Sequence, residues 1–448
     1  MFKTVLVANR GEIARRVLRA CRALGVRGVA VYSEADAGWP HVKDADEAVR
    51  IGPAPARESY LNIERILEVA RVARAEAIHP GYGFLSENWQ FARACGETGA
   101  AFIGPPWTVI KQMGEKIAAR RLMVGAGVPV VPGSEGPVGD LEAAQRTAGA
   151  VGFPIMLKAA GGGGGIGMAR AVDPAQLAQA FPTAQRRAHA AFGVADLYLE
   201  RYLEEARHIE VQVFGDHDGT LVHLHERECS IQRRHQKLIE ESPAPGLPPE
   251  VKRRLVDAAV RGARAVGYVN AGTMEFLVDP AGGFHFLEMN TRLQVEHPVT
   301  EEVTGLDLVQ AQLRVAAGEA LPWKQAEILQ RRAAIECRIY AEDPDRNFMP
   351  SPGTISALRL PEGEGIRVEC GVAEGVTVSV HYDPLLAKVI AWGQDRDEAL
   401  ERMQRALSEF SVEGVKTTLP FHRAVLSSEL FKRGQVHTQL VEQGAFNA

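Results

Sequence analysis

Three patterns along the chain predict a mixed fold, α/β at the start and α+β afterwards. The first quarter of the sequence alternates short apolar runs with helical patterns, which favours a parallel sheet covered by helices. The middle mixes strands and helices without strict alternation, and the last quarter places several strands before one amphipathic helix. At 448 residues, 46% of them hydrophobic, the chain has the length for about three domains, each with its own core.

The first part begins with an apolar run at residues 4–8, which predicts a buried strand. A helix should follow, because Ile13, Val17 and Ala20 recur at helical spacing and Gly25 is placed to end it. Further elements are expected as a strand at 28–32, a helix at 63–73 and a strand at 77–79. This alternation predicts that the strands run parallel.

Two boundaries divide the rest of the chain. Residues 125–139 are rich in Gly and Pro and predict a hinge or boundary, and residues 321–323 predict another. Expected elements of the middle part are strands at 209–214 and 273–278 and a helix at 251–266, and those of the last part are strands at 334–340, 377–380 and 386–392. The final helix should bury a stripe formed by Ala399, Leu400, Met403, Leu407 and Phe410.

The charge and cysteine content narrow the class of protein. The 51 basic and 56 acidic residues give a net charge of −5 without a long run of one sign, which argues against a general nucleic-acid or anionic-membrane surface. The five cysteines are odd in number and never form a CxxC pair, which argues against a disulfide framework or a zinc knuckle. We find no signal peptide and no apolar run of ~18 residues, so we expect a cytoplasmic protein.

A glycine-rich loop is the first motif that indicates chemistry. A predicted strand at 154–158 enters Gly161–Gly165, and residues 168–172 favour a return strand. Glycines let backbone N–H groups approach a phosphate closely, so a hairpin flap over nucleotide phosphates is the preferred interpretation. The loop is not a Walker A motif, and its formal GxGxxG match lacks the helix that a dinucleotide site needs. A flexible linker is the alternative.

The segment 284–298 alternates polar and apolar residues. In an extended chain every second side chain shares a face, so one face would carry Glu288, Asn290, Arg292, Gln294 and Glu296, and the other Leu287, Met289, Leu293 and Val295. A turn at 279–283 after a strand at 274–276 would place Glu275 near Glu288. Carboxylate and amide oxygens suit Mg²⁺, so Glu275, Glu288 and Asn290 are the predicted metal ligands. The alternative is a surface hairpin with exposed acids.

Other polar residues have a simpler default interpretation. His208 and Glu210 share one face of a predicted strand, as do Glu336 and Arg338 further along the chain. Residues 226–237 gather acids and bases, a pattern that is usually a solvated loop. Residues 79–83, His-Pro-Gly-Tyr-Gly, are typical of a turn.

Several of these motifs together resemble one family. The segments are Asn9–Ala14, His79–Asn88, the five-glycine loop, Arg233–Lys237 and Glu288–Pro298. Over essentially the whole chain the sequence resembles biotin carboxylase. The resemblance implies an ATP-grasp fold with an N-terminal Rossmann-like domain at 1–113, an ATP-grasp domain at 114–325 whose glycine-rich lid spans about 130–203, and a C-terminal mixed domain at 326–448.

The resemblance also implies roles for individual residues. The ATP phosphates would be held by Lys116, Lys158 and the loop glycines Gly163, Gly164 and Gly165. Adenine would pack on Met168 and Leu277, and its edge would be read by the hinge residues Glu200, Tyr202 and Leu203. The nucleotide pocket would also be lined by His208, Gln232 and His235. The bicarbonate cradle would be Lys237, Arg292, Gln294 and Val295, the general base Glu296, and the biotin neighbourhood Tyr82 and Arg338. Mg²⁺ or Mn²⁺ is expected, as two ions.

The implied reaction has two stages. Glu296 would deprotonate bicarbonate, which attacks the γ-phosphate of ATP to give carboxyphosphate. Carboxyphosphate would then break into CO₂ and phosphate, the phosphate would remove the ureido proton of biotin, and Arg338 would stabilise the enolate oxygen. The product is carboxybiotin, the first half-reaction of acetyl-CoA carboxylase or of a related acyl-CoA carboxylase, which connects the chain to fatty acid biosynthesis.

Partners follow from the same resemblance. None of the nine methionines is followed by Lys, so the Met-Lys-Met attachment site of biotin is missing and we expect a separate biotin carboxyl carrier protein and separate carboxyltransferase subunits. A homodimer is expected, with Arg16 and Arg19 as contacts. One departure is Ile166, which stands where the family's loop has Arg after the glycines, and either a retuned lid or reduced activity could result.

Two other functions remain open at this point. Another ATP-grasp ligase would activate a different carboxylate as an acyl-phosphate. A catalytically silent nucleotide-binding subunit would regulate a carboxylase complex, with Ile166 as its sequence support. A hydride-transferring oxidoreductase is disfavoured because the first strand lacks the glycine fingerprint.

Overall fold

A computed structural model describes residues 1–159, 168–193 and 195–446. Its N-terminal part is a five-stranded sheet of order β3-β2-β1-β4-β5 in which every pairing is parallel, as the strand and helix alternation predicts. The strands are β1 (Thr4–Val7), β2 (Arg27–Ser33), β3 (Glu47–Gly52), β4 (Ala77–His79) and β5 (Ala101–Phe102). The helices are α1 (Gly11–Ala23), α2 (Pro40–Asp44), α3 (Ile63–Val72), α4 (Trp89–Glu97) and α5 (Trp107–Gly114).

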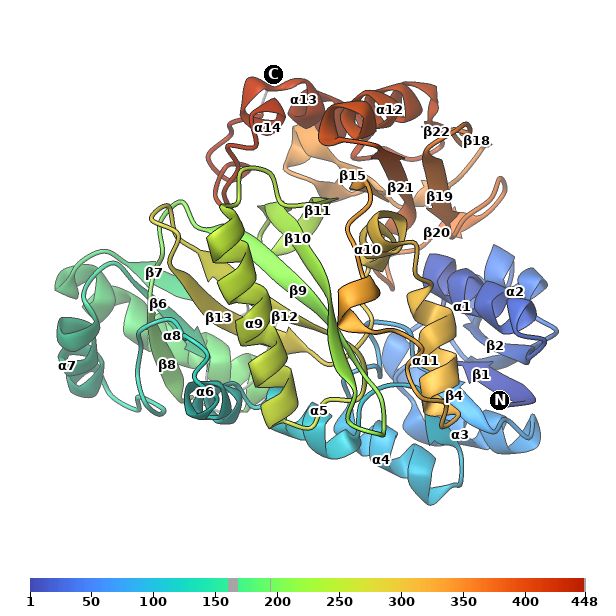
Figure 1. The fold of residues 1–448 in the computed structure, drawn as a ribbon, viewed down its shortest axis with the longest axis horizontal. Helices are drawn as coiled ribbons and strands as arrows, with labels where there is room; N and C mark the ends of the chain where they lie inside the picture. Colours follow the sequence, from blue (N-terminus) through green and yellow to red (C-terminus); the bar gives the residue numbers. More distant parts are fainter. Residues whose placement is uncertain (160–167, 194, 447–448) are drawn as a thin grey trace.

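The central feature is an eight-stranded antiparallel sheet of order β13-β12-β9-β10-β11-β14-β21-β19. Its strands are β9 (Arg207–Gly215), β10 (Leu221–Arg233), β11 (Gln236–Ser242), β12 (Asn270–Val278), β13 (Phe284–Asn290), β14 (Ala333–Tyr340), β19 (Ile366–Cys370) and β21 (Leu385–Gly393). The helix α9 (Pro249–Ala265) lies across β9 and β10 and buries Leu255 in a core with Val211 and Met274 (Figure 1).

Two further helices lie against this sheet. The helix α10 (His297–Thr304) packs on β10, β11, β14 and β21, and α11 (Leu308–Ala316) contacts α1 and β12. In Figure 1, α11 lies between the large sheet and the N-terminal part, and α10 lies beside the C-terminal strands. The first helix therefore touches both the central and the C-terminal parts of the chain.

A third unit lies at one end of the molecule (Figure 1, left). It is a three-stranded antiparallel sheet of order β7-β6-β8, formed by β6 (Ile155–Ala159), β7 (Ala169–Ala171) and β8 (Leu197–Arg201), with α7 (Leu141–Val151) and α8 (Pro174–Phe192). The helix α6 (Lys116–Gly125) lies nearby and contacts α9 and β13. Because β7 is a strand and not a helix, the return-strand interpretation is confirmed.

The last part of the chain completes the large sheet and covers it with helices. The helix α12 (Arg396–Glu409) packs on β21, and the stripe predicted for it is buried, including Phe410 just beyond its end. The remaining elements are α13 (Leu419–Ser427), α14 (Glu429–Lys432), the short strands β15 (Glu342–Asp343), β16 (Met349–Pro350), β17 (Gly353–Thr354), β18 (Ala357–Arg359), β20 (Thr377–Val378) and β22 (Ser411–Glu413), and the 3₁₀ turns η1 (Glu34–Asp36), η2 (Ala56–Glu58), η3 (Gln325–Glu327) and η4 (Pro344–Arg346).

The structure corrects three expectations. The strand β13 ends at Asn290, so residues 291–296 are irregular and do not alternate as a strand would. A β-bulge opposite the step from Glu275 to Phe276 places an extra residue, Leu287, on the cavity side and not on the apolar side. Val295 also lines the cavity, because the chain has left the strand by then.

The third correction concerns the charged segment 226–237. It is the β10–β11 hairpin and not a solvated loop, and Glu226, Arg227 and Glu228 are all buried.

Among the residues described, no helix is both long and apolar enough to cross a membrane.

Candidate active site

A cavity of about 750 Å³ lies where the three parts of the chain meet. It is lined by most of the residues that the sequence singled out: Tyr82, Lys116, Lys158, Met168, Glu200, Tyr202, Leu203, His208, Gln232, His235, Lys237, Glu275, Leu277, Glu288, Asn290, Arg292, Gln294, Val295 and Arg338. Gly163, Gly164, Gly165 and Ile166 lie outside the described residues. Glu296 is fully buried directly behind the wall.

At the centre lies the ammonium group of Lys237, on β11. Its Nζ donates hydrogen bonds to Glu275 Oε1 at 2.8 Å and to Glu296 Oε1 at 2.7 Å, and a third to Glu210. Burying one ammonium among three carboxylates is favourable only because each acid has a cation or donor within reach. The pKa of Lys237 is raised well above its ordinary value, because these acids outweigh the effect of burial.

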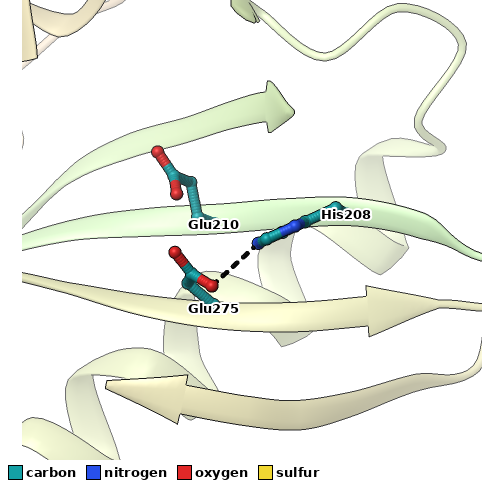
Figure 2. A group of neighbouring side chains, drawn as sticks. All are labelled: His208, Glu210 and Glu275. Carbon is teal, nitrogen blue, oxygen red and sulfur yellow. Dashed lines mark ion pairs between the residues drawn. The ribbon is translucent and has the colours of Figure 1, made fainter. Parts of the chain in front are cut away.

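The sheet explains how these acids come together. His208 and Glu210 lie two residues apart on β9 and point to one face, and Glu275 on the neighbouring β12 is the cross-strand partner of Glu210. Figure 2 shows the His208 ring pointing toward Glu275, with His208 Nε2 at 3.0 Å from Glu275 Oε2, and Glu210 beside them on the same face. Burial would raise the pKa of Glu275, but Lys237 and His208 outweigh it and lower that pKa.

Two sets of possible metal ligands meet near Glu275. His208, Glu210 and Glu275 each offer an atom within 4.8 Å of the others, but the Lys237 ammonium already forms ion pairs with both acids. The predicted metal ligands form the second set: Glu275 and Glu288 are cross-strand partners, and Asn290 Nδ2 donates to Glu275 Oε1 at 2.8 Å.

The second set suits a divalent cation better. The pKa of Glu288 is raised, first by its withdrawal from bulk water and then by the charge of Glu275. A dication between these carboxylates would relieve their repulsion, and oxygen donors of this kind are the ligands Mg²⁺ prefers. The residues present therefore fit a magnesium ion.

Beside Lys237, Arg338 of β14 joins two acids. Its Nη2 donates to Glu296 Oε2 at 2.7 Å, and its Nε lies 2.6 Å from Glu240 Oε1. Burial alone would raise the pKa of Glu296, but Lys237 and Arg338 outweigh it and hold that pKa well below its ordinary range. Burial raises the pKa of Glu240 to about 7, although Arg338 opposes the rise.

The loop after β13 carries the next two side chains. Arg292 Nε donates to Glu87 Oε2 at 2.9 Å, and its guanidinium also donates to Gln294 Oε1 at 2.7 Å and to Asn290 Oδ1 at 3.0 Å. Gln294 Nε2 in turn donates to Glu275 Oε1 at 3.1 Å. These hydrogen bonds hold the irregular loop, so its side chains converge without the regular alternation of a strand.

The other end of the cavity is suited to phosphates and a flat apolar ring. Lys158 forms an ion pair with Glu200 of β8, and burial, together with the charge of Lys158, lowers the pKa of Lys116. Two cations that oppose each other in a cavity are stabilised by an anion between them. Apolar walls come from Met168 and Leu277.

Polar side chains on the neighbouring strands surround this end. Gln232 Nε2 is 3.0 Å from His208 Nδ1, so these two predicted residues lie together in the cavity wall. His235 follows at the β10–β11 turn, where burial lowers its pKa. The Tyr202 hydroxyl accepts a hydrogen bond from Gln439 Nε2 at 2.5 Å, which fixes the wall to the C-terminal segment.

Tyr82 reaches the cavity from the N-terminal part. Asn9 Nδ2 donates to the carbonyl oxygens of Pro80 at 2.7 Å and Tyr82 at 2.8 Å, so the motif at 79–83 is a fixed turn. Its glycines need a positive φ, +63° at Gly81 and +68° at Gly83. The turn interpretation and a functional role are compatible, because this turn presents Tyr82 to the cavity.

Several residues of the site were missed by sequence reasoning. Glu87 pairs with Arg292, and Arg227 is fully buried with its Nε 2.6 Å from Glu210 Oε1. Lys388 is fully buried in β21. One signal was available for Lys388: a lone charged residue inside an apolar strand run must find a partner.

The chain matches known proteins along most of its length. Residues 1–110 match the family model "Biotin carboxylase, N-terminal domain", residues 115–324 match "Carbamoyl-phosphate synthase L chain, ATP binding domain", and residues 336–443 match "Biotin carboxylase C-terminal domain". Biotin carboxylase 2 of Bacillus subtilis (strain 168) is 54% identical over 443 residues, 99% of this chain and 100% of that protein. Biotin carboxylase of Halalkalibacterium halodurans is 53% identical over 441 residues, 98% of this chain and 97% of that protein.

Solved structures agree. The biotin carboxylase domain dimer of Hydrogenobacter thermophilus 2-oxoglutarate carboxylase, in complex with MgADP, ADP and bicarbonate, has a TM-score of 0.96 at 48% identity and covers 99% of this chain and 98% of its own. Biotin carboxylase of Campylobacter jejuni has a TM-score of 0.96 at 45% identity and covers 99% of both chains. The predicted ATP-grasp fold is confirmed, and the chain belongs to the biotin carboxylase family.

Proposed function

We propose that this chain catalyses the ATP- and bicarbonate-dependent carboxylation of biotin that is held on a separate carrier protein. One observation carries the proposal: Glu296 receives Lys237 at 2.7 Å and Arg338 at 2.7 Å, directly behind a cavity that also holds Arg292. A carboxylate between cations can remove the proton from a small bound anion, which can then attack a phosphate. The relative that binds MgADP and bicarbonate supports the same assignment.

The first stage would take place where the two ends of the cavity join. Lys116 and Lys158 would hold the phosphates of ATP, and Mg²⁺ on Glu275, Glu288 and Asn290, or Mn²⁺ in its place, would neutralise their charge. Two such ions are proposed.

Bicarbonate would lie against Lys237, Arg292, Gln294 and the Val295 backbone, all of which line the cavity. Glu296 would take the proton, and the carbonate would attack the γ-phosphate to give carboxyphosphate. Lys237 and Arg338 outweigh burial and hold the pKa of Glu296 well below its ordinary range, which keeps it ionised; its proton affinity would rise when these two cations turn to the bound bicarbonate.

The second stage would involve Tyr82 and Arg338 at the biotin end. Carboxyphosphate gives CO₂ and phosphate, and the phosphate removes the ureido proton of biotin. The Arg338 guanidinium would stabilise the enolate oxygen that develops, and the N–C bond to CO₂ then forms. The adenine contacts proposed for Met168, Leu277 and the 200–203 segment complete the site.

The proposal also covers assembly and partners. A homodimer would use the face that carries Arg16 and Arg19, which pair with Glu301 at 2.8 Å and Glu369 at 2.6 Å. The H. thermophilus relative is a dimer. We propose a carrier protein and carboxyltransferase subunits as partners, a cytoplasmic location and a role in acyl-CoA carboxylation such as that of fatty acid biosynthesis.

The same proposal covers the domain limits. The family models change at 110–115 and 324–336, which supports limits of 1–113, 114–325 and 326–448, with the lid at about 130–203.

The deciding experiment measures incorporation of labelled bicarbonate into free biotin with ATP and Mg²⁺. We expect carboxybiotin together with ATP hydrolysis that depends on bicarbonate, and both should be lost in Glu296→Gln. ATP turnover with an amino acid in place of bicarbonate would favour another ATP-grasp ligase. No turnover under any of these conditions would favour a silent nucleotide-binding subunit.

A further inference from the structure

The buried ammonium group of Lys388 connects the proposed bicarbonate cradle with the proposed biotin end of the cavity. Lys388 lies in the middle of β21, between apolar neighbours, and its exposed fraction is 0%. Its Nζ donates a hydrogen bond of 2.7 Å to the carbonyl oxygen of Val295 and forms an ion pair of 3.1 Å with Glu12 Oε1. A charge this deep in the protein must have a strong structural or functional reason.

The contacts of Lys388 lead to Tyr82. The Tyr82 hydroxyl donates a hydrogen bond to Glu12 Oε1, the same oxygen that faces the ammonium. The Lys388 Nζ also lies 5.8 Å from the centre of the Tyr82 ring, within range of a cation–π contact. Glu12, at the start of α1, is therefore held by both the Lys388 ammonium and the Tyr82 hydroxyl.

The neighbouring strands of the sheet set the position of Lys388. In the β14–β21 register Lys388 is opposite Arg338, and in the β19–β21 register it is opposite Glu369. Burial raises the pKa of Glu12, and Lys388 opposes that rise. Glu336 of β14 and His297 of α10 are further titratable groups near it.

The carbonyl that Lys388 holds belongs to the peptide that joins the bicarbonate cradle to the proposed base. Val295 and Glu296 share it, and Glu296 is the cap residue of α10. Turning that carbonyl turns the Glu296 backbone and the side chains of the loop that contains Gln294. Displacements of about 1 Å in a reacting arrangement can cost 10²-fold in rate.

We propose that Lys388 is a positioning residue for biotin carboxylation: it holds the Val295 carbonyl and, through Glu12, the Tyr82 hydroxyl, and so sets the bicarbonate cradle and the biotin end in register. The proposal rests on the proposed function. It predicts that loss of Lys388 lowers kcat/KM for bicarbonate and the carboxybiotin formed per ATP hydrolysed. It predicts no effect on nucleotide binding. A merely structural ion pair would instead lower stability and leave the kinetic constants of the folded enzyme unchanged.

The test compares Lys388→Met with wild type and with the matched control Lys416→Met, an exposed lysine of the same C-terminal part. In Lys388→Met we expect kcat/KM for bicarbonate to fall by about tenfold or more, with KM for ATP and Kd for MgADP within about twofold. The carboxybiotin formed per ATP hydrolysed should also fall. Lys416→Met should match wild type in each measurement.

The double variant Glu12→Gln/Lys388→Met removes both members of the pair and so leaves no lone carboxylate behind. It should bind MgADP normally and keep the bicarbonate defect. Wild-type bicarbonate kinetics and coupling in any folded Lys388 variant would overturn the proposal. So would a double variant that cannot bind MgADP, because Lys388 would then belong to folding. Wild-type protein that carboxylates no biotin would instead refute the proposed function, before any variant is compared.

Discussion

Replacing Arg338 by Met is the most informative single change in the buried cluster of Lys237, Glu240, Glu296 and Arg338. The side chain keeps its approximate volume but loses the donors that reach Glu296 at 2.7 Å and Glu240 at 2.6 Å. Removing one preorganised donor to a developing oxyanion typically costs about 3 kcal/mol of transition-state free energy, a few hundredfold in kcat. We therefore expect kcat for biotin carboxylation to fall by that factor.

The same change acts on stability, and the two effects can be separated. Breaking a buried pair and leaving its acid behind typically costs about 3–5 kcal/mol of unfolding free energy. The double variant Arg338→Met/Glu240→Gln removes one of the two stranded carboxylates, so it should regain part of the lost Tm. It should regain no kcat, because the donor to the oxyanion is still missing.

The assay is incorporation of labelled bicarbonate into free biotin, with the Kd for MgADP measured alongside. Kd should stay within about twofold of wild type, since Arg338 contacts neither Lys116 nor Lys158 among the interactions of the described residues. Arg253→Met is the matched control, because among the described residues that exposed arginine pairs only with Glu250 on the surface of α9. A kcat for Arg338→Met within threefold of wild type would refute the assigned role.

Three further changes test other parts of the structure. Glu288→Gln removes a predicted metal ligand and should raise the Mg²⁺ concentration for half-maximal activity by about tenfold or more, and an unchanged Mg²⁺ titration would remove Glu288 from the ligand set. Gly371→Ala should lower Tm, because an added Cβ would lie 2.7 Å from the backbone nitrogen of Glu12, whereas Gly38→Ala has open space and should not; equal Tm values in the two variants would contradict the close packing. Burial, with a smaller effect of Asp383, raises the pKa of Glu342 to about 7, so its contribution to stability is present below about pH 4.5 and is lost as pH rises through 7. Relative to wild type, the Tm of Glu342→Gln should therefore increase between pH 5 and pH 8, and a constant difference would show that Glu342 does not titrate in this range.

Much of the fold follows from local patterns. The parallel N-terminal sheet was predictable because short apolar strands and helices alternate there. The hairpin that pairs Glu275 with Glu288 was predictable as well, because two extended segments flank a turn with Gly282 and Gly283. Both depend on residues close together in sequence.

The parts that were wrong depend on strand pairing, which no single segment of the sequence reveals. The bulge at Leu287 comes from the way β13 pairs with β12, and no feature of the segment itself requires it. The segment 226–237 looks like a solvated loop because its charges are plentiful. Those charges are buried because their partners lie on other strands, as Glu210 does for Arg227.

The candidate site shows the same limit. Sequence reasoning placed its residues in one cavity mainly through the family resemblance and through spacing along β9, β12 and β13. It did not identify Lys388, whose importance depends on Val295 and Glu12, respectively 93 and 376 residues away in the chain. An ion pair across such a separation is not visible in a linear pattern.

The eight-stranded sheet passes without interruption from the nucleotide-binding part into the C-terminal part, through the pairing of β11 with β14. Cutting the polypeptide in the connection near residue 325 would therefore expose two long open edges, one on each fragment. Such edges pair with other chains and cause aggregation. A split version of this enzyme, or a permuted one, should keep β11 and β14 on one fragment and place its break in a surface turn that no shared strand crosses.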